Sequence, residues 1–254
     1  MAAQLIDPVD VKMADCTRCV HRDTLLICGR CIPGDICLIA QSGRQIDRFL
    51  RRNREFAEGC LNDFFWERRA IAARYASLEA VQAMHKDHDE VVRRVVASRL
   101  PVDELLDYLH DTDREVRMTV AERIATGHLA ALISDADYLV RLQVAKRLPH
   151  GQLTRLVHDP DSEVRKEVAR RLPSFVLKRM VGDEDAGVRR IAAARMLPDD
   201  AALLLADADW LVRLEAVKCA PLDAIAELVD DAEPDVRAAV YHRLNGFCKR
   251  TRHD

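Results

Sequence analysis

Five cysteines crowd into one short segment near the start of the chain. They form two Cys-x2-Cys pairs, Cys16 with Cys19 and Cys28 with Cys31, followed by Cys37. The backbone turn between the two thiols of such a pair allows both to reach one metal centre. Because the segment is short and is interrupted by proline and glycine, we expect a bound metal to provide its fold.

The residues alone leave two kinds of metal centre open. Two Cys-x2-Cys pairs separated by eight residues can make a four-thiolate zinc site, in which Cys37 is surplus. An iron-sulfur cubane also takes four thiolates and tolerates uneven spacing, since its irons lie at separate corners. In either scheme five thiols compete for four positions, and Cys60 is a distant sixth.

The composition of the chain indicates its compartment and its class of protein. The 254 residues are 49% hydrophobic but only 5% aromatic, which favours thin helical layers of Leu, Val, Ala and Ile. No apolar run approaches the roughly 20 residues that span a bilayer, and residues 1–11 have no signal-peptide pattern. We therefore expect a cytoplasmic protein with reduced thiols and no membrane partner.

A valine-arginine pair recurs every 24 residues and defines the rest of the chain. Fixed self-similarity of this length is typical of a solenoid, in which each unit buries its apolar face against its neighbours. An acid stands three residues before each valine, and an aspartate closes most units. The pairs begin at Val92, Val116, Val140, Val164, Val188, Val212 and Val236.

The residue pattern of each 24-residue unit predicts one helix of about three turns and one shorter element. Asp113 is a good N-cap, and Val116 and Val120 then share one helical face. Proline follows the last apolar residue in several units, as Pro173 does, and ends the helix. The remainder has room only for a 3₁₀ or very short α segment, and no stretch alternates as a strand would.

The joint between the cysteine segment and the repeats is expected at residues 64–66. Arg69 stands at the repeat arginine position, so we interpret residues 68–74 as a degenerate first repeat. The aromatic residues just before it are expected to seal the joint as core. They are Phe64, Phe65 and Trp66. We therefore predict a cysteine-rich domain of residues 1–63 and a repeat domain of residues 64–254.

The repeated arginines are expected to cross-link the units. Asp113 and Arg117 are four apart with the acid first, the favourable order for a pair within a helix. A partly exposed ladder of this kind contributes about 0–1 kcal/mol per pair. Since the valine is expected to be buried, Val140→Asp should destabilise the protein more than Arg141→Ala.

The cysteine segment and the repeats together resemble the leucine-rich repeat variant family. The residues that carry the resemblance are Cys16-x2-Cys19, Gly29-Arg30-Cys31-x2-Gly34-Asp35-x-Cys37, residues 42–49 and residues 65–72, followed by the 24-residue units. It implies a [4Fe-4S] cluster held by Cys16, Cys19, Cys31 and Cys37. It also implies an all-α, right-handed superhelix of alternating α- and 3₁₀-helices without strands. Cys28 lies outside the family pattern.

No catalytic constellation is evident, so we expect a binding protein rather than an enzyme. The chain has no phosphate loop, no nucleophile elbow and no His-Glu metalloprotease helix. The first hypothesis is a scaffold whose cluster makes its interactions with a protein partner sensitive to redox state or oxygen, with a link to nitrogen fixation that the resemblance implies. The alternatives are an electron-transfer component, a zinc-binding scaffold, or a solenoid that binds nucleic acid. The last reading rests on a basic stretch formed by Arg44, Arg48, Arg51, Arg52 and Arg54.

Overall fold

The protein folds as two compact units of short helices. The structure, a computed structural model, describes residues 14–250, with side chains for residues 14–246. Unit 1 comprises Met1–Ile124 and unit 2 comprises Ala125–Asp254. Across the described residues the regular elements are helical, apart from one isolated antiparallel bridge between Ile32 and Ile36, which confirms the all-α prediction. None of these helices is long and apolar enough to cross a membrane.

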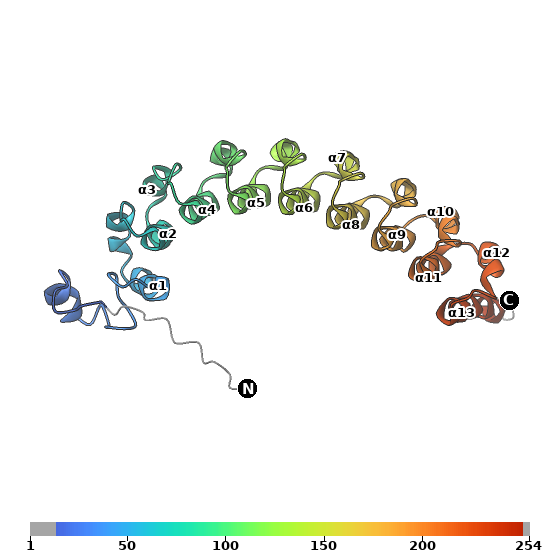
Figure 1. The fold of residues 1–254 in the computed structure, drawn as a ribbon, viewed down its shortest axis with the longest axis horizontal. Coiled ribbons are helices and arrows are strands. Elements are labelled where there is room, and N and C mark those ends of the chain that lie inside the picture. The colour runs from blue at the N-terminus through green and yellow to red at the C-terminus, as the bar shows by residue number, and fades with distance from the viewer. Residues whose placement is uncertain (1–13, 251–254) are drawn as a thin grey trace, which may run out of the picture. The chain divides into compact units, whose positions relative to one another are not determined.

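Unit 1 contains the cysteine segment and the first repeats, so the expected division at residues 63 and 64 stays a prediction. A π-helical turn and helix α1 belong to the cysteine-rich part, and longer helices alternate with short ones after it (Figure 1). The elements are η1 Arg22–Leu26, α1 Gly43–Arg52, η2 Arg54–Phe56, η3 Glu58–Cys60, α2 Trp66–Tyr75, α3 Leu78–Gln82, α4 Glu90–Arg99, η4 Val102–Tyr108 and α5 Arg114–Arg123.

Unit 2 repeats the same alternation of a long and a short element. Its long helices lie in one layer and its short segments in the other (Figure 1). The elements are η5 Thr126–Leu132, α6 Tyr138–Arg147, α7 His150–Leu153, η6 Thr154–Leu156, α8 Ser162–Arg171, η7 Ser174–Met180, α9 Ala186–Ala193, α10 Pro198–Ala201, η8 Ala202–Leu204, α11 Trp210–Cys219, α12 Leu222–Ile225, η9 Ala226–Leu228 and α13 Pro234–Arg250.

The repeat helices begin and end where the sequence predicts. Before α8, the Asp161 carboxylate accepts hydrogen bonds from the N–H groups of Glu163 and Val164, at 2.9 and 3.4 Å. Such a cap satisfies N–H groups that have no partner within the helix. The helix stops before Leu172, whose ψ of 145° is extended as the following Pro173 requires. The repeat valines, from Val92 to Val236, are 0% exposed, so the predicted facing of the helices is confirmed.

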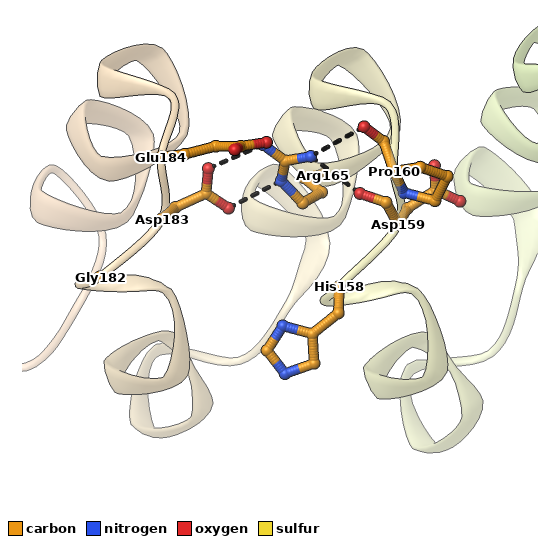
Figure 2. A pocket seen from close by; sticks show the side chains of 7 residues that line it. All are labelled: His158, Asp159, Pro160, Arg165, Gly182, Asp183 and Glu184. Atoms are coloured by element: carbon orange, nitrogen blue, oxygen red, sulfur yellow. Dashed lines mark hydrogen bonds and ion pairs between the residues drawn. The ribbon is translucent and has the colours of Figure 1, made fainter.

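The repeat arginines do cross-link neighbouring repeats, but the predicted partner was wrong, and Arg141 and Arg165 are buried rather than partly exposed. Arg165 donates to both carboxylate oxygens of Asp183, at 2.8 and 3.0 Å, and to the backbone carbonyls of Asp159 and Pro160 (Figure 2). The partner therefore lies 18 residues ahead, because the acid four residues before the arginine is occupied as the helix cap. Arg141 repeats this geometry with Asp159, and their side chains are only 9% and 2% exposed.

A second series of arginines, which the sequence analysis missed, caps the helices from the next repeat. Arg171 donates through Nη1 to the carbonyls of Ala145 and Leu148, at 2.5 and 2.9 Å. These carbonyls end α6, where the backbone oxygens have no partner within the helix. Arg99, Arg123, Arg195 and Arg243 donate to the corresponding carbonyls of their own preceding repeats.

Cys219 interrupts this series, and we expect Cys219→Arg to stabilise unit 2. The half-buried thiol reaches only the Ala194 carbonyl, at 3.7 Å, and α9 is eight residues long against ten for α8. An arginine at this position would meet the carbonyls of Ala193 and Met196 by the register of Arg171. The gain should be about 1 kcal/mol, measured as a rise in the thermal midpoint. Cys219→Ala is the control, and an arginine variant no more stable than the alanine variant would refute the capping role.

The aspartates that pair with the repeat arginines should make unit 2 sensitive to acid. The hydrogen bond from Arg189 lowers the pKa of Asp207, and that from Arg213 lowers the pKa of Asp231. A lowered pKa in the folded state contributes stability above the unfolded value, about 3.9, that is lost as the pH falls towards the folded value. We expect the urea midpoint to be level between about pH 7 and 5 and to drop below about pH 4. Asp207→Asn should show a smaller drop, and an equal drop in both proteins would contradict this assignment.

Candidate metal centre

Two glycine turns and a short bridge arrange the second half of the cysteine segment. Gly29 and Gly34 have φ values of +66° and +79°, a region that residues with a Cβ rarely adopt. Ile32 and Ile36 exchange two backbone hydrogen bonds of 2.8 Å around the second turn. Because neighbours of a bridged antiparallel pair face each other, Cys31 and Cys37 are placed opposite one another.

The first pair of cysteines is held by a tight polar turn. The Asp15 carboxylate accepts hydrogen bonds from the N–H and the hydroxyl of Thr17, and these bonds lower the pKa of Asp15. The chain then turns again, with the N–H of Arg22 donating to the Cys19 carbonyl at 3.1 Å. Both Cys16 and Cys19 are half-buried in this turn.

One cavity collects the four cysteines predicted as ligands. Cys16, Cys19, Cys31 and Cys37 line it, together with Ala14, His21, Arg22, Leu26, Pro33 and Ile36. Cys28 does not line it and is exposed. Cys60 is buried elsewhere, and its burial raises the pKa of its thiol. The structure therefore brings the predicted set together and leaves the other two cysteines of this region outside, while the role of the four as ligands stays a prediction.

The chemistry of this cavity fits a cluster of several irons. Burial, together with the nearby thiols of Cys37, Cys19 and Cys16, raises the pKa of the Cys31 thiol. Four thiolates so close would repel each other, and iron ions offset that repulsion because thiolate is a ligand they favour. Leu26, Pro33 and Ile36 supply apolar walls around the sulfur atoms. Within residues 14–246, no group of three or more Cys, His, Asp or Glu side chains is arranged to hold a single metal ion.

The cysteine loops are tied to α1 at two places, which the sequence analysis did not foresee. Near the start of α1, Arg48 pairs with Asp35, and the N–H of Cys37 donates to the Gln45 carbonyl at 3.3 Å. Beyond the end of α1, Arg30 donates to the Asn53 side-chain oxygen at 2.8 Å and pairs with Glu55.

The second tie is reinforced from the helix side. Asn53 is 3% exposed and returns a hydrogen bond of 3.3 Å to the Arg30 carbonyl. The Arg30 guanidinium lies 5.5 Å from the centre of the Phe56 ring, which also makes edge-to-face contacts with the rings of His21 and Phe49. Because Arg30 directly precedes Cys31, this contact positions one of the four thiols.

Helix α1 is joined in turn to the first repeat helix, α2. Asp47 accepts a hydrogen bond of 2.8 Å from the Tyr75 hydroxyl, and the two helices pack together. From α2, Arg68 donates to the carbonyls of Ile39 and Ala40, both at 3.3 Å. The sequence prediction that aromatic residues seal this joint was wrong for Phe64 and Trp66, which are 85% and 39% exposed. Hydrogen bonds from Arg68 and Tyr75 hold the joint instead.

Comparison with known proteins decides the family. The model of the family described as "LRV protein FeS4 cluster" matches residues 12–59, and that of "Leucine rich repeat variant" matches residues 138–161 and 163–185. A solved structure described as "a leucine-rich repeat variant with a novel repetitive protein structural motif" is 50% identical. The match covers 91% of this chain and 99% of that one, with a TM-score of 0.87. The chain belongs to the leucine-rich repeat variant family.

Membership of the leucine-rich repeat variant family identifies the cofactor as well as the fold. The cysteine segment is an FeS4 cluster domain, so the cofactor is a [4Fe-4S] cluster rather than zinc. When bound, the cluster supplies one-electron chemistry or a site sensitive to oxidation. This chain contributes the four thiols of the cavity, the apolar walls and the two ties to α1.

A curated relative from Rhodobacter capsulatus is similar in sequence to part of this leucine-rich repeat variant chain. It is described as an "uncharacterized 27.7 kDa protein in nifB 3'region" and is 37% identical over 87 residues. The match covers 34% of this chain and 35% of the relative, so it spans only about a third of that protein.

Proposed function

We propose that this protein is a binding scaffold whose [4Fe-4S] cluster controls how the first repeats present their surface, and that it is not an enzyme. The observation that carries the proposal is the continuous set of contacts from the cluster loops to α1 and from α1 to α2. Arg30 and Asp35 lie on the loops beside the thiols, and their partners Asn53 and Arg48 lie on or next to α1. Tyr75 and Asp47 then join α1 to the repeats.

The physical basis of this control is that cluster binding and loop folding are coupled. The loops have little regular secondary structure, so the cluster supplies much of their folding free energy. When the cluster is lost or altered, the loops should loosen, and Arg48 and Asn53 would lose their partners. Helix α1 would then keep its packing on α2 but lose both ties to the loops.

The hollow around Arg165 is explained by the pairing of the repeats. The hollow around Arg165 is lined by His158, Asp159, Pro160, Gly182, Asp183 and Glu184 (Figure 2). Arg165, Asp159 and Asp183 are already engaged in pairs that stabilise the repeats. We therefore assign this hollow a structural role.

The biological setting of the proposal comes from the relative. Because that protein is described by its place in the nifB 3' region, we propose that this chain serves nitrogen fixation, in the reducing cytoplasm where free thiols and iron-sulfur clusters persist. Its macromolecular partner would then be bound or released as the cluster responds to oxygen or redox state.

Hydrogen exchange tests the proposed control directly. We expect backbone protection in α1 to fall at least about tenfold when Cys16→Ala removes the cluster, while α11 in unit 2 is unchanged, because opening is local to the elements that lose contacts. Cys219→Ala is the matched control, since it removes a thiol outside the cluster domain. Unchanged protection of α1 in the cluster-free protein would refute the proposal.

A second candidate function is an electron carrier, which the half-buried state of Cys16 and Cys19 favours. Thiols near the surface place a cluster within reach of a docked redox partner. Reversible one-electron cycling without loss of iron would support this candidate. Release of iron during a single oxidation would support the sensing scaffold instead.

A further inference from the structure

Helices α1, η2, α2 and α4 present exposed arginines that neither the cluster nor the repeat ladders use. We call this surface the arginine face and define it as Arg44, Arg51, Arg52, Arg54, Arg74 and Arg94. Arg51, Arg74 and Arg94 have side chains 66%, 56% and 43% exposed, and the others are exposed residues. Arg44 and Arg51 are seven residues apart and so lie on the same side of α1.

The arginine face is continuous within unit 1. Asp47 on α1 binds Arg51 at 2.7 Å and lies 3.8 Å from Arg74 on α2, so one carboxylate joins the two helices. Arg54 lies 5.8 Å from the centre of the Tyr75 ring on α2. Arg74 and Arg94 then line one groove with Val95, Ser98, Thr119, Glu122 and Arg123. A ligand following this surface would meet guanidinium groups on α1, α2 and α4 in turn.

Positive charge dominates this surface although the whole chain carries a net charge of -3. The neighbouring carboxylates include Glu67 beside Gly43, Asp47, Glu115 and Glu122, against the six arginines and Arg123, while Glu55 next to Arg54 is paired with Arg30. Asp47 is shared by two arginines and a tyrosine hydroxyl. Every cation of the face is arginine, whose planar fork matches two phosphate oxygens and keeps its charge at any working pH.

The scarcity of exposed apolar groups on these helices distinguishes between partners. Among the residues that the structure describes, no large exposed hydrophobic side chain lies on α1, α4 or α5, and α2 carries one, Trp66, at the opposite end from Arg74. A protein partner would need an apolar centre to its interface, whereas interfaces with nucleic acids are more polar and strongly positive. The surface therefore fits phosphodiester groups better than a folded protein.

We propose that the arginine face binds the phosphate backbone of a nucleic acid. This inference rests on the proposed function, because α1 carries three of the six arginines of the face and is the helix that the cluster loops brace. Contacts to phosphate give affinity that does not depend on base sequence and that weakens as salt displaces the protein. Loss of the cluster should accordingly weaken the binding by loosening α1.

Fluorescence anisotropy with the intact cluster, under anaerobic conditions, tests the inference. The probes are a labelled duplex DNA and a single-stranded RNA of mixed sequence and equal length, with labelled polyglutamate as the acidic alternative. With about four phosphate contacts, we expect the affinity for nucleic acid to fall about 100-fold between roughly 50 and 200 mM salt. The double variant Arg44→Glu and Arg52→Glu should bind at least about tenfold more weakly.

The matched control is the double variant Arg155→Glu and Arg179→Glu, which changes the net charge equally on exposed arginines of unit 2. It should retain affinity within about twofold. Failure of both nucleic acids to bind, an equal loss in both double variants, or binding of polyglutamate alone would each overturn the inference. Hydrogen exchange of α1 separates the two proposals: if α1 still responds to the cluster, the scaffold function stands and only the partner class falls.

Discussion

Arg141→Ala is expected to lower the free energy of unfolding of unit 2 by about 3–5 kcal/mol. The substitution leaves the Asp159 carboxylate, 2% exposed, without its charged partner. It also removes the donor to the Asp135 and Ala136 carbonyls, which Arg141 meets at 2.7 and 3.3 Å. A buried charge without a partner costs far more than a lost surface pair, so the effect should approach that of Val140→Asp.

Urea unfolding followed by circular dichroism measures this loss. Arg155→Ala is the matched control, because it removes an exposed arginine from the same unit and should change stability by less than about 0.5 kcal/mol. If Arg141→Ala costs no more than Arg155→Ala, the ladder contributes no more than a surface pair and the burial argument fails.

Cys31→Ala should abolish the absorbance of the cluster, whereas Cys28→Ala should leave it. The two cysteines share one Cys-x2-Cys pair, but only Cys31 lines the cavity, opposite Cys37 across the Ile32–Ile36 bridge. A cubane with three thiolates has an iron without a protein ligand, and its domain loses the folding free energy that the metal supplies.

The variants Cys31→Ala and Cys28→Ala control for each other, since each removes one thiol from the same loop. Cys16→Ala, Cys19→Ala and Cys37→Ala are expected to behave as Cys31→Ala does. Bleaching in Cys28→Ala with retention in Cys31→Ala would exchange the roles of these two residues and would mean that the loop is arranged differently around the cluster.

The repeat architecture could be predicted from sequence because its signals are local and periodic. An aspartate caps the long repeat helices from α4 to α11, a buried valine follows three residues later, and proline stops several of these helices, as at Asp161, Val164 and Pro173. Each of these effects acts within about ten residues. Repetition at 24 residues then makes the same local solution recur.

The pairing of the arginines could not be predicted in the same way because it depends on the distance between layers. Sequence favours Asp161 as the partner of Arg165, four residues away, but that carboxylate is occupied by backbone N–H groups. Asp183 becomes the partner only when the next layer stacks. The second series did leave a signal, since arginine recurs at positions 99, 123, 147, 171, 195 and 243, with Cys219 in the gap.

The metal centre shows the same division between local and long-range information. The spacing of the cysteines and the family resemblance indicated which four thiols meet, and the structure places those four around one cavity. The ties from Arg30 to Asn53 and from Asp35 to Arg48 join residues 23 and 13 positions apart, with no periodicity to reveal them. The proposed function depends on these ties, so the contacts that say most about function were the hardest to predict from sequence.

Metal and sulfide analysis of protein purified without oxygen tests whether the cysteine segment holds a [4Fe-4S] cluster. We expect about four irons and four acid-labile sulfides per chain, with negligible zinc. The same sample should lose its iron, and with it the protection of α1, on exposure to excess chelator and oxygen. Stoichiometric zinc without sulfide would contradict the cluster, and with it the control of α1 by redox state or oxygen.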